Sequence, residues 1–322
     1  MLKMYHARSH SGSSPELWEE TWNEGSLQEA MRFCHVDPLR PIFERYAKPG
    51  SLMLEGGCGL GQYVAHYSAR GVRVVGLDFA RFTLSRLLAH DSSLMVCAGN
   101  VATLPFPDDT FDLYYSGGVV EHFEEGAEKA LLEARRVLRP DGVLLISVPY
   151  FNPLRRALSR FSKNDRRRVS LSGKDNPDRY EEKQFWQYAY TKREFKSLLK
   201  AAGLTVISTQ GYAILFGLYE MPLVANAIGA CSKRWQANGA RENGASAIDR
   251  ASIKVDGGEP GHSLLKRLIV SEDDTVPVAG AFLHALRETC ANMMMYVCTR
   301  DDARRSDVAS LARPRSVAPQ IR

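Results

Sequence analysis

The sequence predicts an α/β fold in which a mostly parallel sheet is covered by helices on both faces. Short apolar segments alternate with helical segments from residue 51 to residue 149. These apolar segments are nearly continuous, which is typical of parallel strands buried on both sides. With 322 residues, 44% of them hydrophobic and 25% charged, the chain can bury the core that such a sheet needs.

The elements follow one another in a regular order. The expected strands cover residues 51–56, 72–78, 93–99, 111–118 and 143–149. The expected helices between them cover residues 62–71, 79–90 and 124–142. The last of these helices ends in a Pro-Asp-Gly sequence, which stops helices. After a break the pattern resumes with a helix over 191–203 and strands over 204–209 and 292–300.

The remaining segments divide the chain. Residues 1–49 are expected to form an N-terminal helical cap, in which Trp18 and Trp22, four residues apart, share one helix face for docking. The main domain covers 50–300 and carries two insertions, a basic one at 151–185 and a longer one at 211–288. Residues 301–322 have the composition of a disordered tail.

Composition excludes several classes of protein. The six cysteines are scattered without a CxxC pair, which disfavours a disulfide framework and a zinc site and indicates a reducing compartment. The first residues contain no apolar signal segment, so we expect a cytoplasmic protein. A net charge of +5 is small for this length and does not by itself indicate nucleic-acid binding.

The first expected strand ends in a glycine-rich turn, "LEGGCGLGQ", at residues 54–62. A dinucleotide-binding turn requires Gly-x-Gly-x-x-Gly, but Gln62 stands where the third glycine would be. The Gly-Lys-Ser/Thr of a P-loop is also absent. Two interpretations remain for this tight turn, which follows the acid Glu55. The turn and the acid bind a ligand with a positive group, or the turn is purely structural.

Polar and small residues at the ends of the next strands favour a nucleoside ligand. Asp78 ends the second strand, where a carboxylate can accept hydrogen bonds from both ribose hydroxyls. Asn100 follows the third strand and carries an amide that can bind an adenine edge. The small residues 116–118 end the fourth strand.

Together these segments resemble the class I S-adenosylmethionine-dependent methyltransferases. The resemblance is to the small-molecule "methyltransferase type 11" group that includes ubiquinone- and menaquinone-biosynthesis enzymes. It rests on "LEGGCGLGQ", "VVGLDFA", "GNVATLPFPDDTFDLYYSGGVVEHF", "EARRVLRPDGVLLISVP" and "YAYTKREFKSLLKAAGLTVI", and it covers about residues 51–150, 186–210 and 290–300. It implies a Rossmann-like sheet of seven strands, mostly parallel, with one antiparallel edge strand.

The resemblance also implies S-adenosyl-L-methionine as the cofactor and assigns residues to its parts. The methionine part would meet Glu55, Gly57 and Gly59, with backbone supplied by Ser116 and Gly117. The nucleoside would meet Asp78 at the ribose and Phe79, Asn100 and Val101 at the adenine. Two positions depart from the family pattern, because Glu55 and Asn100 both stand where aspartate is more usual.

His122 is the candidate for acid–base chemistry. It follows the fourth strand, where the methyl group should lie, and it would act as a base or contact the acceptor. Alternatively, Glu121 and His122 only fix the start of a helix. Four aromatic residues would either line the acceptor pocket or pack the insertion onto the domain: Tyr150, Trp186, Tyr188 and Tyr190.

We therefore expect transfer of a methyl group to oxygen, nitrogen or carbon of a small or lipid-linked metabolite. The alternatives are a catalytically silent scaffold module and, more distantly, a nicotinamide oxidoreductase. No metal and no nucleic-acid partner are expected, since neither a carboxylate cluster nor the Asn/Asp-Pro-Pro-Tyr signature of base methylation is present. Residues 212–234 are apolar and then basic, which suits a lid, a homodimer surface or peripheral membrane contact.

Overall fold

The computed structural model describes residues 1–6, 10–12, 14–23, 25–161, 184–218, 272 and 280–301. Among these residues a seven-stranded sheet forms the centre of the fold, with strand order β4-β3-β2-β5-β6-β9-β8. Its strands are β2 (Leu52–Gly56), β3 (Arg73–Asp78), β4 (Met95–Ala98), β5 (Phe111–Gly117), β6 (Leu138–Pro149), β8 (Leu204–Tyr212) and β9 (Met293–Arg300). This is the predicted Rossmann-like α/β fold.

The pairing of the strands places their ends. β4, β3, β2, β5 and β6 are parallel neighbours, so their carboxyl ends share one edge of the sheet. β2 lies between β3 and β5, and the order of the strands reverses at that point. The expected antiparallel strand is β9, which pairs with β6 and with β8 and therefore lies one place inside the edge of the sheet.

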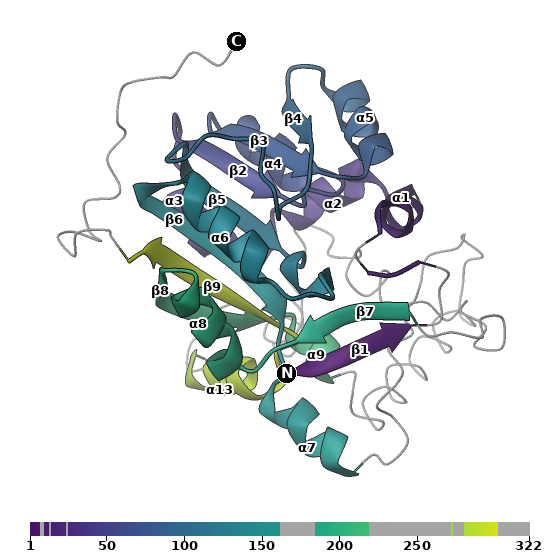
Figure 1. Cartoon of the computed structure of the whole chain (residues 1–322), viewed down its shortest axis with the longest axis vertical. Helices are drawn as coiled ribbons and strands as arrows, with labels where there is room; N and C mark the ends of the chain where they lie inside the picture. Colours follow the sequence, from purple (N-terminus) through teal and green to yellow (C-terminus); the bar gives the residue numbers. More distant parts are fainter. Residues whose placement is uncertain are drawn as a thin grey trace, which may run out of the picture.

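Helices cover both faces of the sheet (Figure 1). Alternate residues of each strand point to opposite layers: Leu54 belongs to one buried cluster and Met53 to the other. The first cluster includes side chains of α6 (Glu128–Val137) and α8 (Lys192–Ala201). The second includes side chains of α3 (Arg40–Tyr46), α4 (Gln62–Ser68) and α5 (Arg81–His90). The strands therefore supply apolar side chains to both layers, as their nearly continuous apolar sequences predict.

The N-terminal segment contains more than the expected helical cap. Its helices are α1 (Pro15–Asn23), α2 (Leu27–Phe33) and α3. They are preceded by strand β1 (Leu2–His6), which pairs antiparallel with β7 (Gln184–Ala189) in a separate two-stranded sheet. Figure 1 shows this ribbon beside the main sheet. A short strand of this kind is stable only when it finds a partner, and here the paired residues are 178 to 187 positions apart in sequence.

Two further boundaries differ from the sequence prediction. The helix expected over 124–142 is α6, which begins at Glu128 and ends at Val137, and β6 begins at once at Leu138. Loop η1 (Val120–His122) forms a single 3-10 turn after β5. The rest of the described chain adds α7 (Pro153–Phe161), α9 (Ile214–Leu218) and α13 (Gly280–Cys290).

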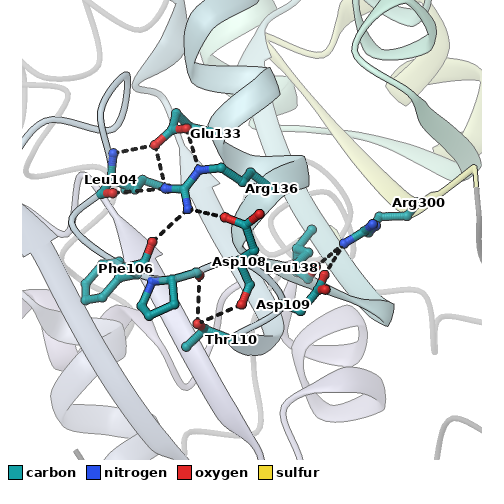
Figure 2. Close-up of polar contacts among 10 residues, drawn as sticks. Leu104, Phe106, Asp108, Asp109, Thr110, Glu133, Arg136, Leu138 and Arg300 are labelled. Atoms are coloured by element: carbon teal, nitrogen blue, oxygen red, sulfur yellow. Dashed lines mark hydrogen bonds and ion pairs between the residues drawn. The ribbon is translucent and has the colours of Figure 1, made fainter.

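Arg136 of α6 fixes the loop between β4 and β5 (Figure 2). Its guanidinium donates to the carbonyl oxygens of Leu104 and Phe106 at 3.0 and 2.8 Å. It also pairs with Asp108 at 2.8 Å and with Glu133 at 2.7 Å. Glu133 in turn accepts from the backbone N–H of Leu104 at 2.7 Å. The turn-rich sequence "LPFPDD" is therefore held by side chains of a helix.

Several predictions fall wholly or partly on residues that the structure does not describe. These are most of the insertions at 151–185 and 211–288, most of the apolar-basic segment 212–234, and the tail after Asp301. Within the described ranges, every helix is too short or too polar to cross a membrane.

Candidate functional site

The predicted site residues meet at the carboxyl ends of the parallel strands. Glu55 is the fourth residue of β2 and pairs in register with Gly76 of β3 and Tyr115 of β5. Asp78 ends β3, and Ser116 lies near the end of β5. Neighbouring strands lie about 5 Å apart, so these residues form one edge. It coincides with the reversal of strand order, which is where ligands bind in open α/β sheets.

The turn after β2 is shaped by left-handed backbone. Gly57 has a φ of 77° and Gly59 a φ of 49°, values that L-residues with side chains rarely adopt. A Cβ at position 57 would lie 2.3 Å from Cγ2 of Val119, and one at position 59 would lie 3.0 Å from Cε2 of Trp22. Glycine is therefore required here by conformation and by close packing, in addition to any approach of a ligand.

Asp78 ties this turn to the end of β3. Its carboxylate accepts from the backbone N–H of Gly59 at 2.8 Å and of Ala80 at 2.9 Å. Burial raises the pKa of Asp78, while these backbone N–H groups lower it. Each carboxylate oxygen has more than one lone pair, so Asp78 can still accept from a ligand.

Glu55 offers an unused acceptor beside the turn. It is buried, and among the described residues its Oε2 atom has no hydrogen-bond partner. Burial raises its pKa well above the usual range, and the nearby Asp78 adds to the effect. A buried acceptor without a partner costs free energy of about 1–3 kcal/mol, so a ligand with a donor, above all a cationic one, would stabilise it.

The predicted adenine edge is less enclosed. Phe79 is half-buried, whereas Asn100 is exposed and its Oδ1 accepts from the backbone N–H of Ala102 at 2.8 Å. Val101 is buried in the cluster that faces α6. The structure thus brings Phe79 and Asn100 to the edge of the sheet, and it directs the side chain of Val101 into the core.

Glu121 is a functional candidate that sequence reasoning treated only as a helix-fixing residue. It lies on η1 with 1% of its surface exposed, and its Oε2 atom has no hydrogen-bond partner among the described residues. Burial raises the pKa of Glu121 to about 8. Ser116, near the end of the strand that precedes η1, is also buried. A carboxyl group that titrates near neutrality suits proton transfer.

His122 is adjacent to Glu121 and is oriented by the backbone. Its Nδ1 atom lies 2.8 Å from the carbonyl oxygen of Trp186. Since a carbonyl only accepts, this contact assigns the ring proton of neutral His122 to Nδ1 and leaves Nε2 as the basic nitrogen. Nε2 lies 3.9 Å from Oε1 of Glu121.

Among the four predicted acceptor aromatics, Trp186 packs directly against His122. The ring centroid of Trp186 is 4.6 Å from that of His122 and 5.7 Å from that of Trp18. Tyr150, Tyr188 and Tyr190 are buried in the main hydrophobic cluster. The hydroxyls of Tyr150 and Tyr188 donate to the carbonyl oxygens of Glu288 and Glu124 at 3.2 and 2.8 Å. These three tyrosines therefore contribute to the core, and Tyr190 also interacts electrostatically with Glu121.

Helix α1 reaches the site from outside the sheet. The spacing of Trp18 and Trp22 predicts a docking face, and the structure places that face over the glycine turn and His122. No local sequence pattern specifies where α1 packs on the sheet, so sequence reasoning missed both indoles as site residues. Within the described ranges there is no group of three His, Cys, Asp or Glu side chains that could hold a metal ion.

Comparisons with known proteins agree with this geometry. Residues 54–146 match the model of the methyltransferase domain family. The chain is 31% identical over 183 residues to a probable S-adenosylmethionine-dependent methyltransferase of Mycolicibacterium smegmatis. The matched region covers 56% of this chain and 63% of the relative. It is 34% identical over 99 residues to malonyl-[acyl-carrier protein] O-methyltransferase of Serratia marcescens, covering 31% and 38%.

A third relative is named probable tRNA methyltransferase 9B, from Mus musculus. The identity is 36% over 120 residues, covering 37% of this chain and 25% of the relative. The chain thus spans less than two thirds of the length of each of these curated relatives. The part that matches the methyltransferase domain family, residues 54–146, contains the glycine turn and the carboxyl ends of β2, β3, β4 and β5. The names of the relatives differ in their acceptors.

Proposed function

We propose that the chain is a class I S-adenosylmethionine-dependent methyltransferase and that it transfers the methyl group of this cofactor to an acceptor that carries a hydrogen on its nucleophilic atom. The observation that carries the proposal is the turn Gly57–Gly61, joined to Asp78 at the reversal of strand order. This edge combines a buried acid, a glycine turn and a second acid at the next strand end.

The residues present fit the cofactor. Glu55 has a buried acceptor atom without a partner in the described chain, which suits the ammonium group of a methionine part. Asp78 retains lone pairs for ribose hydroxyls, and Phe79 and Asn100 lie beside it for the base. Ser116 and Gly117, at the end of β5, would line the cofactor site on that side. When bound, the cofactor supplies a methyl group on a positively charged sulfur.

The chain's own residues would align the acceptor, exclude water and receive a proton. Transfer proceeds by in-line displacement, in which alignment contributes most of the rate. As the new bond to carbon forms, a hydroxyl or amine acceptor loses its proton. We propose that Glu121, in its ionised form, takes this proton, and that His122 is the second candidate. The proposal favours oxygen or nitrogen over carbon as the nucleophile.

Two features support a small or lipid-linked acceptor. The relative from Serratia marcescens is named for O-methylation of a carrier-bound malonyl group. Arg155, which begins the basic stretch of the chain, is buried and donates to the carbonyl of Tyr150 and the side chain of Asn292, so it is not available to bind phosphates. The name of the tRNA methyltransferase relative makes RNA the competing acceptor.

The test incubates the protein and methyl-labelled S-adenosylmethionine with an extract of the source cells. The products are then divided into a water-soluble small-molecule fraction, an organic fraction, RNA and protein. We expect the label in one of the first two fractions. Label in RNA would refute the small-acceptor proposal. No label in any fraction, together with no binding of S-adenosylhomocysteine, would favour the scaffold alternative.

Glu121→Gln tests the proposed proton transfer in the same assay. Removing a positioned base lowers a rate typically by 10²–10⁴-fold, so we expect labelling to fall by about 100-fold. Binding of S-adenosylhomocysteine should stay unchanged, because Glu121 lies on η1 and not on the glycine turn. His122→Gln is the matched comparison, and unchanged labelling in both variants would exclude base catalysis by this pair.

A further inference from the structure

We propose that Trp18 and Trp22 of α1 form the roof of the cofactor site and favour the charged sulfonium of S-adenosylmethionine over the neutral thioether of S-adenosylhomocysteine. This inference rests on the proposed function, because it concerns the cofactor of that reaction. It assigns to α1 a role in binding in addition to docking.

Trp22 lies directly against the glycine turn. A Cβ at position 59 would be 3.0 Å from both Cε2 and Cζ2 of its indole and 3.3 Å from Nε1. The ring therefore faces the backbone that we assign to the methionine part of the cofactor. Trp22 is half-buried.

Trp18 continues the roof toward the acceptor side. Its ring stacks on that of Trp22, with centroids 5.8 Å apart and planes at 26°. Its other neighbours are Trp186, stacked at 5.7 Å, and His122, edge-on at 4.8 Å. The two indoles of α1 thus extend from the turn after β2 to η1 after β5. A cofactor whose methionine part contacts the glycine turn and whose methyl group faces η1 would pass under both indoles.

Arg86 holds the end of α1 in this position. Its guanidinium donates to the carbonyl oxygens of Trp22 at 2.9 Å, Asn23 at 3.3 Å and Gly25 at 2.9 Å. A cation at a helix C-terminus satisfies the last carbonyls and complements the helix dipole. Arg86 belongs to α5, which follows Asp78 after two residues. Trp18 is fixed separately, because its Nε1 donates to the carbonyl of Gly12 at 2.8 Å.

The chemistry of the roof suits a cation. The faces of indole rings carry partial negative charge and attract cations within about 6 Å of the ring centroid. The neutral thioether gains only dispersion contacts from the same rings. Losing such an interaction weakens binding of a cation by about 2- to 30-fold, while the neutral ligand loses much less.

The experiment measures the dissociation constants of both ligands by calorimetry for the wild type, Trp22→Leu and Trp22→Phe. We expect Trp22→Leu to weaken S-adenosylmethionine about 2- to 30-fold more than S-adenosylhomocysteine. Trp22→Phe keeps an aromatic face and should retain most of the ratio. Phe33→Leu, at an exposed aromatic of the neighbouring helix α2, is the control and should leave both constants unchanged.

Arg86→Gln tests the positioning role, with the exposed Arg81→Gln on the same helix as its control. We expect Arg86→Gln to shift the ratio in the same direction as Trp22→Leu, and Arg81→Gln to leave it as it is. Equal weakening of both ligands in Trp22→Leu, or no weakening, would overturn the inference while leaving the proposed function intact. A wild type that binds neither ligand would instead refute the proposed function.

Discussion

The carboxyl group of Glu121 is enclosed by groups that offer it little charge compensation. His122 is its neighbour on η1, and two phenols interact with it electrostatically: Tyr190, directly after β7, and Tyr212 of β8. Burial is the main cause of its raised pKa, which lies at about 8 against an ordinary value of 4.5. Such a group keeps its proton at pH values where an exposed glutamate is ionised.

This shift predicts a dependence of stability on pH. Between about pH 4.5 and pH 8 the folded state retains the proton of Glu121 while the unfolded state releases it. The contribution to stability is therefore fully present below pH 4.5 and is lost as pH rises through about 8. Glu121→Gln removes the effect, so its unfolding midpoint should rise relative to the wild type as pH increases over this range.

Thermal unfolding of both proteins at several pH values between 4.5 and 8.5 measures this difference. Contributions from Glu55 and Asp78, whose pKa values are also raised, are present in both proteins and cancel in the comparison. A midpoint difference that stays constant across the range would contradict the assignment.

The glycine turn supports a second prediction at the residue scale. Gly57→Ala places a side chain at a φ of 77° and a Cβ 2.3 Å from Val119. The left-handed backbone costs about 1–2 kcal/mol, and overpacking costs about 1–3 kcal/mol more. Gly50→Ala is the matched control, because Gly50 has a φ of 84° with no atom within 4 Å of the added Cβ.

Chemical denaturation separates the two costs. Gly50→Ala should lose only the conformational part, and Gly57→Ala should lose clearly more and also bind S-adenosylhomocysteine more weakly. Equal losses of unfolding free energy in the two variants would contradict this prediction, because Val119 would then accommodate the added Cβ without a free-energy cost.

At the scale of elements, the loop after β4 depends on α6. Arg136→Met removes hydrogen bonds to two carbonyl oxygens and the ion pairs with Asp108 and Glu133. Hydrogen bonds to charged groups contribute about 1.5–3 kcal/mol each, and part of this is offset because the guanidinium is partly exposed. We expect a loss of about 2 kcal/mol in the free energy of unfolding, measured by denaturant titration. Lys129→Met, an exposed position on the same helix, should change it little, and an equal effect at both positions would contradict this role for Arg136.

The elements that could be predicted from sequence are those with strong local signals. The strands around the glycine turn could be predicted from their apolar runs. Helix α8 could be predicted from its N-terminal capping box, which Thr191 and Glu194 form. The β1–β7 ribbon could not be predicted, because its two strands are marginal alone and become stable only by pairing over a long sequence distance. The end of α6 was misplaced because Leu138 continues the apolar pattern of the helix into β6.

At the scale of the whole molecule, the sheet determines where the site lies. Glu55, Asp78 and Ser116 were predictable because acids and small residues at strand ends converge wherever parallel strands share an edge. Trp18 and Trp22 were predictable as a docking face but not as site residues, since nothing local specifies where α1 packs. Tyr150, Tyr188 and Tyr190 lie close to predicted site residues in sequence, but their side chains are part of the hydrophobic core.

We propose that the edge formed by Glu55, the glycine turn and Asp78 binds an S-adenosyl cofactor. Calorimetric titration of the wild type with S-adenosylhomocysteine, and separately with NAD⁺, tests this claim most directly. We predict one molecule of S-adenosylhomocysteine bound per chain and no heat from NAD⁺. An absence of binding by S-adenosylhomocysteine, or binding of NAD⁺ in its place, would contradict the account.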